Sequence, residues 1–598
     1  MTVSRKQTQA KLDLLIAAVS KHVPEQTYTV ADRFEECAQQ YPDRIFLICE
    51  DVEISFAELN RQANRYAHVA LESGIKPGDV GAVMIENRPE FFYAWLGLAK
   101  IGAIAALLNT QARGRALSHA IEETDSKILF LGSECAEKFA TVEGLAEKLR
   151  CFYVADGAPG TVPAGVEPLA DALAAASNTN PAPSLRADVV GETPVFYVFT
   201  SGTTGLPKAA IISHMRWLGV GDGWAAVLGM TAEDVFYCIL PLFHGAAGMS
   251  LVSNALACGA PIVLCRAFSA SRFWPDVRKH GVTIFQYVGE VCRYLINRAP
   301  QDNDKDHSLK KMTGAGMTAE VWRSFVQRFG DIQIVEGWGA TEANCSMMNL
   351  DGVMGSCGRI PFKELSNARL VKYDIENDCH LRSDDGYLIE CEPGETGELL
   401  GMVLNIPGVG AGRFEGYVSA QATENKILRN VFTEGDAWFQ SGDLFIEDAE
   451  GYFYFSDRIG DTYRWKSENV STTEVTRALE GYQPAEMVNV YGVAVPGQEG
   501  RAGMVAIELK RGEAFDPMMF YAQATEKLAA YAVPLFVRVR AQSDLTVTFK
   551  LRKVDLQKAG YDPNSTNDPL YVLDKAAGTY VPYSEAALKK LGVEPFGP

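Results

Sequence analysis

Apolar residues along the chain follow two spacings, one typical of helices and one typical of buried strands. Residues 31–40 and 55–71 carry apolar side chains at helical intervals, whereas 44–49, 80–85 and 127–131 are short apolar runs of strand length. Helices and strands therefore alternate, as they do when helices cover a mainly parallel sheet. The pattern predicts an α/β fold.

The character of the sequence changes in its second half. From about residue 351 it becomes β-rich and rich in turns, and strand–helix–strand spacing resumes before a tail that we read as irregular. A length of 598 residues also exceeds what one core supports. We expect a lead-in over residues 1–30, a large domain of layered α/β subdomains with a β-rich part over 31–456, and a smaller α+β domain over 457–598.

One apolar stretch, residues 91–108, approaches the length that a membrane-spanning helix needs. Gly97, Lys100 and Gly102 interrupt it, and residues 103–108 are typical of a strand. We therefore predict a buried helix followed by a strand. Peripheral contact with the inner face of a membrane stays open.

Composition narrows the class of protein. The 56 Lys and Arg residues against 75 Asp and Glu give a net charge of −19, which argues against general nucleic-acid binding. Twelve scattered cysteines without a CxxC pair, and no signal peptide, indicate reduced thiols in a cytoplasmic protein. The eight histidines show no spacing typical of a structural metal site.

A hydroxyl- and glycine-rich turn is the most informative stretch of the chain. It follows the strand-like residues 195–199 and contains Thr200, Ser201, Gly202, Thr203, Thr204, Gly205 and finally Lys208. Glycines let backbone N–H groups approach an anion closely, and the lysine adds a positive charge suited to a polyphosphate. It is not a Walker A loop, because the required Gly-Lys-Ser/Thr ending is absent. By itself the turn is a phosphate-loop candidate or an ordinary surface turn.

In full, Thr200-Ser-Gly-Thr-Thr-Gly-Leu-Pro-Lys208 resembles the signature of the adenylate-forming enzymes, which include acyl-CoA synthetases, luciferases and peptide-synthetase adenylation domains. Further stretches resemble other motifs of these enzymes in the expected order. They are Leu240–Gly245 with His244, the loop Gly314, Ala315 and Gly316, the box Gly337–Glu342, Ser441-Gly-Asp443, and Ser456–Asp461.

The resemblance implies a role for each residue. Thr341, Glu342 and His244 would be catalytic together with Lys550, and Glu342 would also hold Mg²⁺ that bridges phosphates. The seven residues named above for the hydroxyl- and glycine-rich turn, called the phosphate turn below, would bind ATP or AMP. So would the loop 314–316, Trp338, Gly339, Asp443 and Arg458. From composition alone, His244 is a packed core histidine and Lys550 an ordinary solvated lysine. The order of the motifs makes a site role for His244 equally favoured.

The last part of the chain resembles one branch in particular, the fatty-acid transport protein and very-long-chain acyl-CoA synthetase family. The evidence is Thr462–Val475, Thr546–Leu556 and the tail that follows. The resemblance implies an acyl-CoA synthetase-like fold with a mobile C-terminal domain, a hinge at Gly460 and Asp461, and a CoA-side face of Trp465, Lys466, Ser467, Glu468 and Asn469. Two positions depart from the family, since Val547 replaces a common glycine and Trp338 replaces tyrosine.

The implied reaction activates a long or very long fatty acid with ATP to acyl-AMP and transfers the acyl group to CoA, with fatty-acid uptake as a consequence. A bile or sterol acid is an alternative substrate, and a transport protein with secondary ligase activity is an alternative function. Amino-acid adenylation is disfavoured, because the segment around His244 offers no acidic side chain for a substrate ammonium. The preferred length of the acyl chain and the oligomeric state of the protein stay open.

Overall fold

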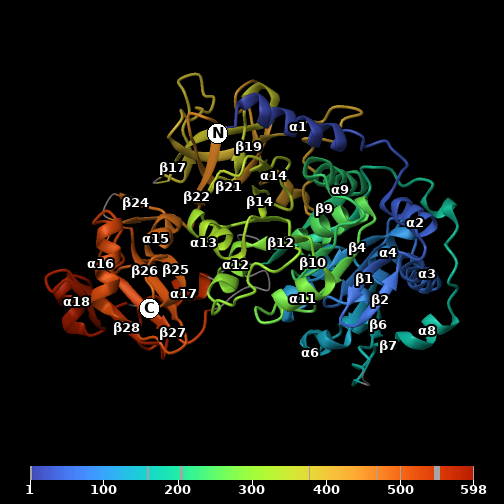
Figure 1. The fold of residues 1–598 in the computed structure, drawn as a ribbon, viewed down its shortest axis with the longest axis horizontal. Coiled ribbons are helices and arrows are strands. Elements are labelled where there is room, and N and C mark those ends of the chain that lie inside the picture. Colours follow the sequence, from blue (N-terminus) through green and yellow to red (C-terminus); the bar gives the residue numbers. More distant parts are fainter. Residues whose placement is uncertain are drawn as a thin grey trace. The chain divides into compact units, whose positions relative to one another are not determined.

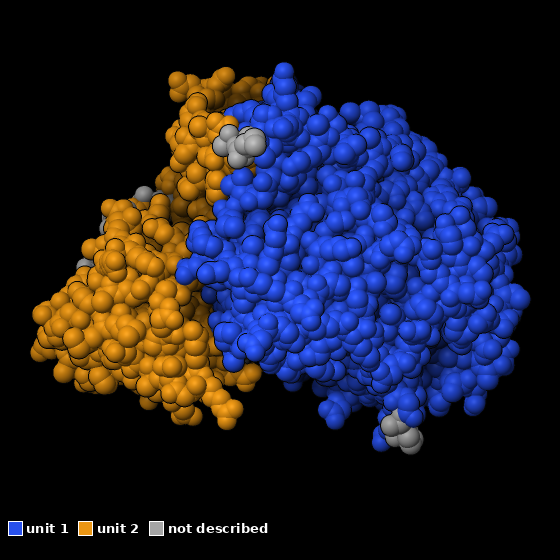
Figure 2. All heavy atoms as spheres, viewed as in Figure 1, with its two compact units in different colours: residues 1–368, 401–430, 434–439 blue, residues 369–400, 431–433, 440–598 orange. Residues whose placement is uncertain are grey.

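The computed structural model describes residues 3–157, 160–201, 206–375, 377–465, 468–498, 500–543 and 553–596. The chain divides into two compact units (Figures 1 and 2). Unit 1 comprises residues 1–368, 401–430 and 434–439, and unit 2 comprises 369–400, 431–433 and 440–598. The expected domain boundary between residues 456 and 457 stays a prediction, because compactness does not show where a moving part begins.

One sheet of unit 1 carries the phosphate turn at its edge. Its seven strands have the order β7-β6-β5-β3-β4-β8-β9, and only β8 and β9 pair antiparallel. Strands β3, β4 and β5 are buried at every residue, as strands covered on both faces are. The strands are β3 (Val80–Met84), β4 (Ile104–Leu107), β5 (Ile128–Gly132), β6 (Arg150–Val154), β7 (Glu167–Pro168), β8 (Pro194–Ser201) and β9 (Pro207–Ser213).

The second sheet of unit 1 has eight strands in the order β15-β14-β13-β12-β10-β11-β1-β2. Its inner neighbours are parallel, and an antiparallel strand closes each edge. Two short strands of the unit lie outside it, β16 (Gly358–Arg359) and β20 (Ile427–Arg429). The members are β1 (Ile45–Cys49), β2 (Val52–Ser55), β10 (Phe236–Cys238), β11 (Ile262–Leu264), β12 (Ile284–Val288), β13 (Lys311–Ala315), β14 (Gln333–Trp338) and β15 (Met347–Met348).

Helices surround these sheets, as Figure 1 shows. They are α1 (Arg5–Val19), α2 (Val30–Gln40), α3 (Phe56–Glu72), α4 (Pro89–Lys100), α5 (Gly114–Glu123), α6 (Ala136–Phe139), α7 (Leu145–Lys148), α8 (Leu169–Ala175), α9 (His214–Leu228), α10 (Val252–Cys258), α11 (Phe273–His280), α12 (Gly289–Ile296), α13 (Ala319–Phe329) and α14 (Ala420–Glu424). Short 3₁₀ turns cover Ser133–Cys135, Pro183–Arg186 and Lys363–Leu365, and a π-helix covers Gly245–Leu251.

The apolar stretch 91–108 forms helix α4 and then strand β4, which confirms the helix-then-strand prediction. Helix α4 packs tightly on α3. The close approach requires glycine at position 97, since a Cβ atom there would lie only 2.8 Å from the carbonyl oxygen of Ala63. Lys100 is fully buried and hydrogen-bonds to Glu35 and Asn60. Within the described residues no helix is both long enough and apolar enough to cross a membrane.

Unit 2 combines a β-rich part with a small α+β part. Strands β22 (Tyr452–Arg458), β21 (Ala437–Glu447), β19 (Thr396–Met402), β17 (Ala368–Asp374) and β18 (Cys379–His380) are neighbours in that order. The α+β part has a sheet ordered β25-β26-β27-β28-β29 and a hairpin of β23 (Tyr463–Trp465) and β24 (Glu468–Val470). Its members are β25 (Ala485–Ala494), β26 (Arg501–Leu509), β27 (Phe536–Arg540), β28 (Leu570–Asp574), β29 (Thr579–Pro582), α15 (Thr472–Leu479), α16 (Pro517–Lys527), α17 (Val554–Ala559) and α18 (Glu585–Leu591).

The α/β fold class is confirmed, and one expectation about the tail is wrong. The tail that the sequence indicated as irregular supplies α17, β28, β29 and α18. Strand β28 pairs with β27 on one side and β29 on the other, so it lies inside the sheet. The strands are five and four residues long, and the partner β27 lies about 30 residues earlier, which leaves little local signal.

Candidate active site

The phosphate turn joins strands β8 and β9 at the edge of the seven-stranded sheet. Thr200 and Lys208 are directly opposite each other in the antiparallel ladder, and both side chains are half-buried. The backbone of Ser201 ends β8. The predicted anion-binding residues Gly202, Thr203, Thr204 and Gly205 lie outside the described residues. The hairpin thus places the hydroxyl and the ammonium that flank the turn on neighbouring strands.

A tyrosine that the sequence reading missed lies between these two strands and the predicted metal ligand. The Tyr417 hydroxyl donates a hydrogen bond of 2.8 Å to Glu342 Oε1, and the Lys208 ammonium lies 5.7 Å from the centre of the Tyr417 ring. Burial and the Glu342 carboxylate raise the pKa of Tyr417, against a hydrogen bond from Thr200. Tyr417 therefore stays neutral and donates. Thr200, Lys208, Glu342 and Tyr417 are called the Glu342 cluster below.

The exposed edge of β9 explains how Tyr417 reaches this position. Tyr417 forms an antiparallel bridge with Ala210, the N–H of Ile211 donates to the carbonyl of Gly416, and that of Val418 donates to the carbonyl of Ala209. The segment thus extends the sheet by one short strand-like stretch. A glycine followed by an aromatic residue in a turn-rich region was the only signal in the sequence, and it is too common to identify a site.

His244 precedes the π-helix Gly245–Leu251, and its Nδ1 accepts a hydrogen bond of 3.3 Å from the N–H of Ala246. A π-helix is rare and is frequent at functional sites. A Cβ atom at Gly245 would lie 2.9 Å from Thr341 Oγ1, so the two predicted motifs are in close contact. The structure brings His244 and Thr341 into one region of unit 1, and the catalytic roles of both stay predictions.

A buried carboxylate organises the predicted adenine side. Gly314 and Ala315 end β13, and Gly316 follows with a φ of 87°. Glu336 on β14 accepts hydrogen bonds from the N–H groups of Gly316 and Met317, and from the hydroxyl of Tyr287 at 2.5 Å. Burial raises the pKa of Glu336 to about 8. These bonds fix the loop at the end of β13.

Trp338 and Gly339 lie at the end of β14, the strand next to β13. Trp338 is the last residue of β14 and is 9% exposed, and Gly339 is exposed. Because β13 and β14 are parallel neighbours, the loop at Gly316 and the aromatic ring lie at the same end of the sheet. This is the end at which open α/β sheets bind ligands. The two stretches that the resemblance assigned to the adenine side thus lie at the ends of adjacent strands, and their role stays a prediction.

The ribose-side residues belong to unit 2. Asp443 on β21 is opposite Arg458 on β22, and Arg458 Nε lies 3.4 Å from Asp443 Oδ1. The guanidinium is half exposed, whereas the carboxylate is largely buried. The hydroxyl of Ser441 accepts from the N–H of Asp443, and the N–H of Gly442 donates to Glu398. The hairpin therefore presents an oriented carboxylate beside a half-exposed cation.

The predicted hinge lies in the turn that follows, residues 458–462, called the hinge turn below. Gly460 has a φ of 92°, a conformation that side-chain-bearing residues rarely adopt. A Cβ atom there would meet no atom within 4 Å, so only the backbone conformation requires glycine. Asp461 pairs with Lys553 at 2.9 Å, and Lys553 also donates to Thr472. One ion pair therefore ties the hinge turn to residues far along the chain.

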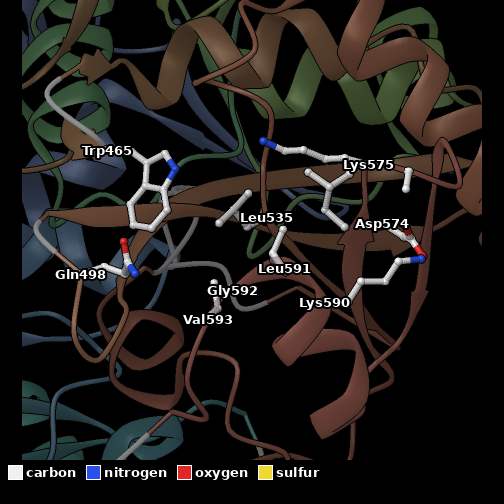
Figure 3. Close-up of a pocket in the computed structure, with 11 residues that line it drawn as sticks. Trp465, Gln498, Leu535, Asp574, Lys575, Lys590, Leu591, Gly592 and Val593 are labelled. Carbon is white, nitrogen blue, oxygen red and sulfur yellow. The ribbon is translucent and has the colours of Figure 1, made fainter.

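The predicted CoA-side face is only partly described. Trp465 ends β23 opposite Glu468 on β24, and the side chains of Glu468 and Asn469 are exposed. Lys466, Ser467 and the predicted catalytic Lys550 lie outside the described residues. Trp465 is 5% exposed and lines a cavity of about 250 Å³ within unit 2, with Gln498, Lys575 and the ion pair of Lys590 with Asp574 on its walls (Figure 3). An aromatic ring and cationic groups thus share one concave surface.

The donor set at Glu342 fits a magnesium ion that arrives with a nucleotide. Among the described residues, no three His, Cys, Asp or Glu side chains gather closely enough to enclose a metal ion by themselves. Magnesium usually binds through one or two protein carboxylates together with substrate phosphates. The half-buried Glu342 carboxylate, which accepts a hydrogen bond from Tyr417, would provide one such ligand.

The chain is similar in sequence to known proteins over most of its length. The chain is 42% identical to long-chain fatty acid transport protein 1 of Rattus norvegicus over 564 residues, which are 93% of this chain and 86% of the relative. It is 39% identical to long-chain fatty acid transport protein 6 of Mus musculus over 562 residues, 93% and 89% of the two chains. The motif-based resemblance to these proteins is confirmed.

Solved structures show the same fold. The crystal structure of the anthranilate CoA ligase AuaEII in complex with anthranoyl-AMP has a TM-score of 0.74 at 21% identity and covers 90% of this chain and 98% of its own. A fatty acyl CoA synthetase of Mycobacterium tuberculosis has a TM-score of 0.61 at 22% identity, with 89% and 98% covered. A model of the AMP-binding enzyme family matches residues 34–401. The chain belongs to the AMP-binding enzyme family.

Proposed function

We propose that this protein is an ATP-dependent acid–CoA ligase that converts a long-chain fatty acid to its acyl-CoA. The observation that carries the proposal is the Glu342 cluster, in which a carboxylate, a tyrosine and a lysine from three chain segments meet beside the phosphate turn. The similarity to fatty acid transport proteins over 93% of the chain supports a fatty acid as the substrate.

The first half-reaction joins two anions. A carboxylate oxygen of the fatty acid attacks the α-phosphorus of ATP, the bond from that phosphorus to the β-phosphate oxygen breaks, and pyrophosphate leaves. Bringing anions together requires cations and oriented donors. Lys208 neutralises phosphate charge, the hydroxyl turn donates hydrogen bonds to the phosphates, and Thr341 donates to the α-phosphate. Glu342 would hold Mg²⁺, which would supply further neutralisation of phosphate charge.

Lys550 is proposed to reach the α-phosphate during this step, as the resemblance implies. In the second half-reaction the CoA thiolate attacks the acyl carbonyl carbon, a new carbon–sulfur bond forms, and AMP leaves with the electrons of the acyl–oxygen bond. The face of Trp465, Glu468 and Asn469 is proposed to serve CoA. Asp443 and Arg458 are proposed to hold the ribose in both steps.

The apolar character of the segment after His244 supports a long acyl chain. Phe243, Ala247 and Leu251 are buried in or beside the π-helix, and the indole N–H of Trp217 donates to the carbonyl of Gly248, which fixes the helix backbone. A substrate held by apolar contact gains about 0.8 kcal/mol for each buried CH₂ group. Affinity should therefore rise with chain length until the apolar surface is used up.

Product formation with a panel of carboxylic acids tests the proposal. Purified protein would be supplied with ATP, Mg²⁺, CoA and fatty acids of increasing length, together with acetate, a bile acid and amino acids, and AMP and acyl-CoA would be measured. We expect kcat/KM to rise from short to long fatty acids. Higher activity with acetate, an amino acid or a bile acid than with palmitate would contradict the proposed substrate. Contact with a membrane surface stays a prediction and oligomeric state stays open, and this test addresses neither.

A further inference from the structure

One arginine outside the recognised motifs holds the backbone on both sides of Glu342. Arg216 lies in the first turn of α9, and its Nη2 donates hydrogen bonds of 2.7 Å to the carbonyl oxygens of both Thr341 and Ala343. Its side chain is 15% exposed. Because these two carbonyls flank Glu342, the guanidinium fixes the peptide units from which the carboxylate projects.

The same arginine also reaches the segment that carries Tyr417. Arg216 Nη1 lies 3.9 Å from Glu415 Oε2, and the Glu415 carboxylate accepts hydrogen bonds from both the N–H and the hydroxyl of Ser213. Glu415 precedes by two residues the tyrosine that donates to Glu342. The backbone and the carboxylate of Glu342 are therefore held by one connected set of side chains.

We propose that Arg216 is a positioning residue for the Glu342 carboxylate and, through it, for the magnesium–nucleotide complex. The proposal rests on the function proposed above, in which Glu342 binds Mg²⁺. Arg216 acts through Glu342 and touches no reacting atom. Side chains that orient a metal ligand usually change metal affinity or activity by roughly 10–100-fold when they are replaced.

The chemistry of the contacts explains why arginine serves this purpose. One guanidinium nitrogen satisfies two carbonyls while the other faces a carboxylate, which a planar fork of fixed geometry can do. Lysine has a single, shorter-reaching ammonium, so it can replace some of these contacts but not all at once. Arg216→Lys should therefore retain part of the effect, and Arg216→Met should retain none.

Arg328 provides a matched control. It is also 15% exposed, pairs with Asp304, and donates to several backbone carbonyls, those of Ile296 and Arg298 among them. Replacing it with methionine breaks the same kinds of contact on α13, away from Glu342. Arg328→Met therefore measures the cost of losing a buried arginine without moving the metal ligand.

The experiment compares Arg216→Met, Arg216→Lys and Arg328→Met with the wild type by calorimetric titration with Mg·ATP and with metal-free AMP, alongside Tm. For Arg216→Met we expect Mg·ATP binding to weaken by about 10–100-fold with AMP binding unchanged. Arg216→Lys should weaken it less, and Arg328→Met should lower Tm alone. The Mg²⁺ concentration for half-maximal acyl-AMP formation should follow the same order.

Equal losses of Mg·ATP and AMP affinity in Arg216→Met, or an equal loss of Mg·ATP affinity in Arg328→Met, would overturn the proposal. If Arg216→Met does not fold, Arg216→Lys decides, and wild-type Mg·ATP affinity in that variant would overturn it. A wild-type protein that binds Mg·ATP but forms no acyl-AMP would refute the proposed function, and the binding titrations would still decide the role of Arg216.

Discussion

The Glu342 cluster of unit 1 and the hinge turn of unit 2 hold their residues in opposite ways. Glu342 and Tyr417 are 75 residues apart and meet through a direct hydrogen bond, with Thr200 and Lys208 joining from a third segment. In the hinge turn, Arg458, Gly460 and Asp461 lie within four residues of one another, and Arg458 is 54% exposed. The cluster brings together residues that are distant in the sequence, whereas the hinge turn is one contiguous stretch that the ion pair of Asp461 with Lys553 ties to a later part of the chain.

The difference matches what each task requires. Electrostatic stabilisation of a transition state works through donors and charges that are already in place, so bracing by several segments is favourable. A turn that absorbs backbone rotation must carry few such braces. In the described residues the ion pair of Asp461 with Lys553 is one brace that would have to be released. The comparison predicts that substitutions in the Glu342 cluster slow acyl-AMP formation, whereas substitutions in the hinge turn slow the complete reaction.

Replacing Glu342 should have the largest effect. Glu342→Gln keeps the shape and a hydrogen-bond acceptor for Tyr417 but removes the charge that would bind Mg²⁺. We expect acyl-AMP formation to fall by roughly 10²–10³-fold, as for loss of one transition-state stabiliser. ATP–pyrophosphate exchange measures this step. Conversion of supplied acyl-AMP and CoA to acyl-CoA should stay near the wild-type rate, and an equal loss there would contradict the assignment.

Removing the Tyr417 hydroxyl should have the next largest effect. Tyr417→Phe leaves the buried ring beneath Lys208 but withdraws the donor to Glu342, so acyl-AMP formation should fall by about 10–100-fold. Tyr237→Phe is the matched control, because Tyr237 is also buried and donates to a carboxylate, Asp276, at 2.9 Å. Similar rates of pyrophosphate exchange in the two variants would show that Tyr417 acts only through stability.

A substitution in the hinge turn should act on the complete reaction rather than on one half. Gly460→Ala must adopt a positive φ, at a cost of about 1–2 kcal/mol, and meets no steric obstacle. Overall acyl-CoA turnover should fall by up to about 30-fold, since 1.4 kcal/mol is a factor of ten, with acyl-AMP formation less affected. Gly512→Ala, at a φ of 89° with the same open space, is the control and should lose stability only. Proline at position 460 would be uninformative, because its ring fixes φ near −65°.

The smallest effect is expected on the CoA-side face. Asn469 is exposed on β24, so Asn469→Ala should leave the fold intact and remove at most one hydrogen bond to CoA, worth about 0.5–1.5 kcal/mol. The KM for CoA should rise a few-fold in the thioester-forming step. Acyl-AMP formation in the same preparation serves as the internal control. A change confined to acyl-AMP formation would place this face on the wrong half-reaction.

The sequence could point to candidate residues where they belong to a short contiguous motif, and their roles stay predictions. Thr200 and Lys208, and Thr341 and Glu342, belong to contiguous motifs, and the structure brings Lys208 and Glu342 to the same tyrosine. Tyr417 and Arg216 could not be found in this way. Tyr417 reaches the site through pairing at the edge of β9, and Arg216 through the orientation of α9, and both are long-range consequences of the fold.

The same reasoning applies to the elements. The buried strand β3 and the amphipathic α3 were predictable because a local apolar pattern specifies each of them. Strand β28 was missed because β27, the strand that joins it to the sheet, lies about 30 residues earlier, and its hairpin partner β29 is only four residues long. Gly460 was recognised from a motif, whereas its positive φ, which determines what can replace it, became visible only in the backbone.

Helix α1 has a consequence for the order in which unit 1 can be assembled during synthesis. Thr8 accepts a hydrogen bond from Arg359, and Lys11 pairs with Asp351 at 2.9 Å, so these polar partners of α1 follow it by some 340 to 351 residues. Helix α9, which packs against α1, begins earlier, at His214. At about 5–20 residues per second, a ribosome needs roughly 20 to 70 seconds to make Arg359 after Thr8 has been made. During the later part of that interval α1 can pack on α9 but still lacks its polar partners, and chaperones that bind nascent chains have an opportunity there.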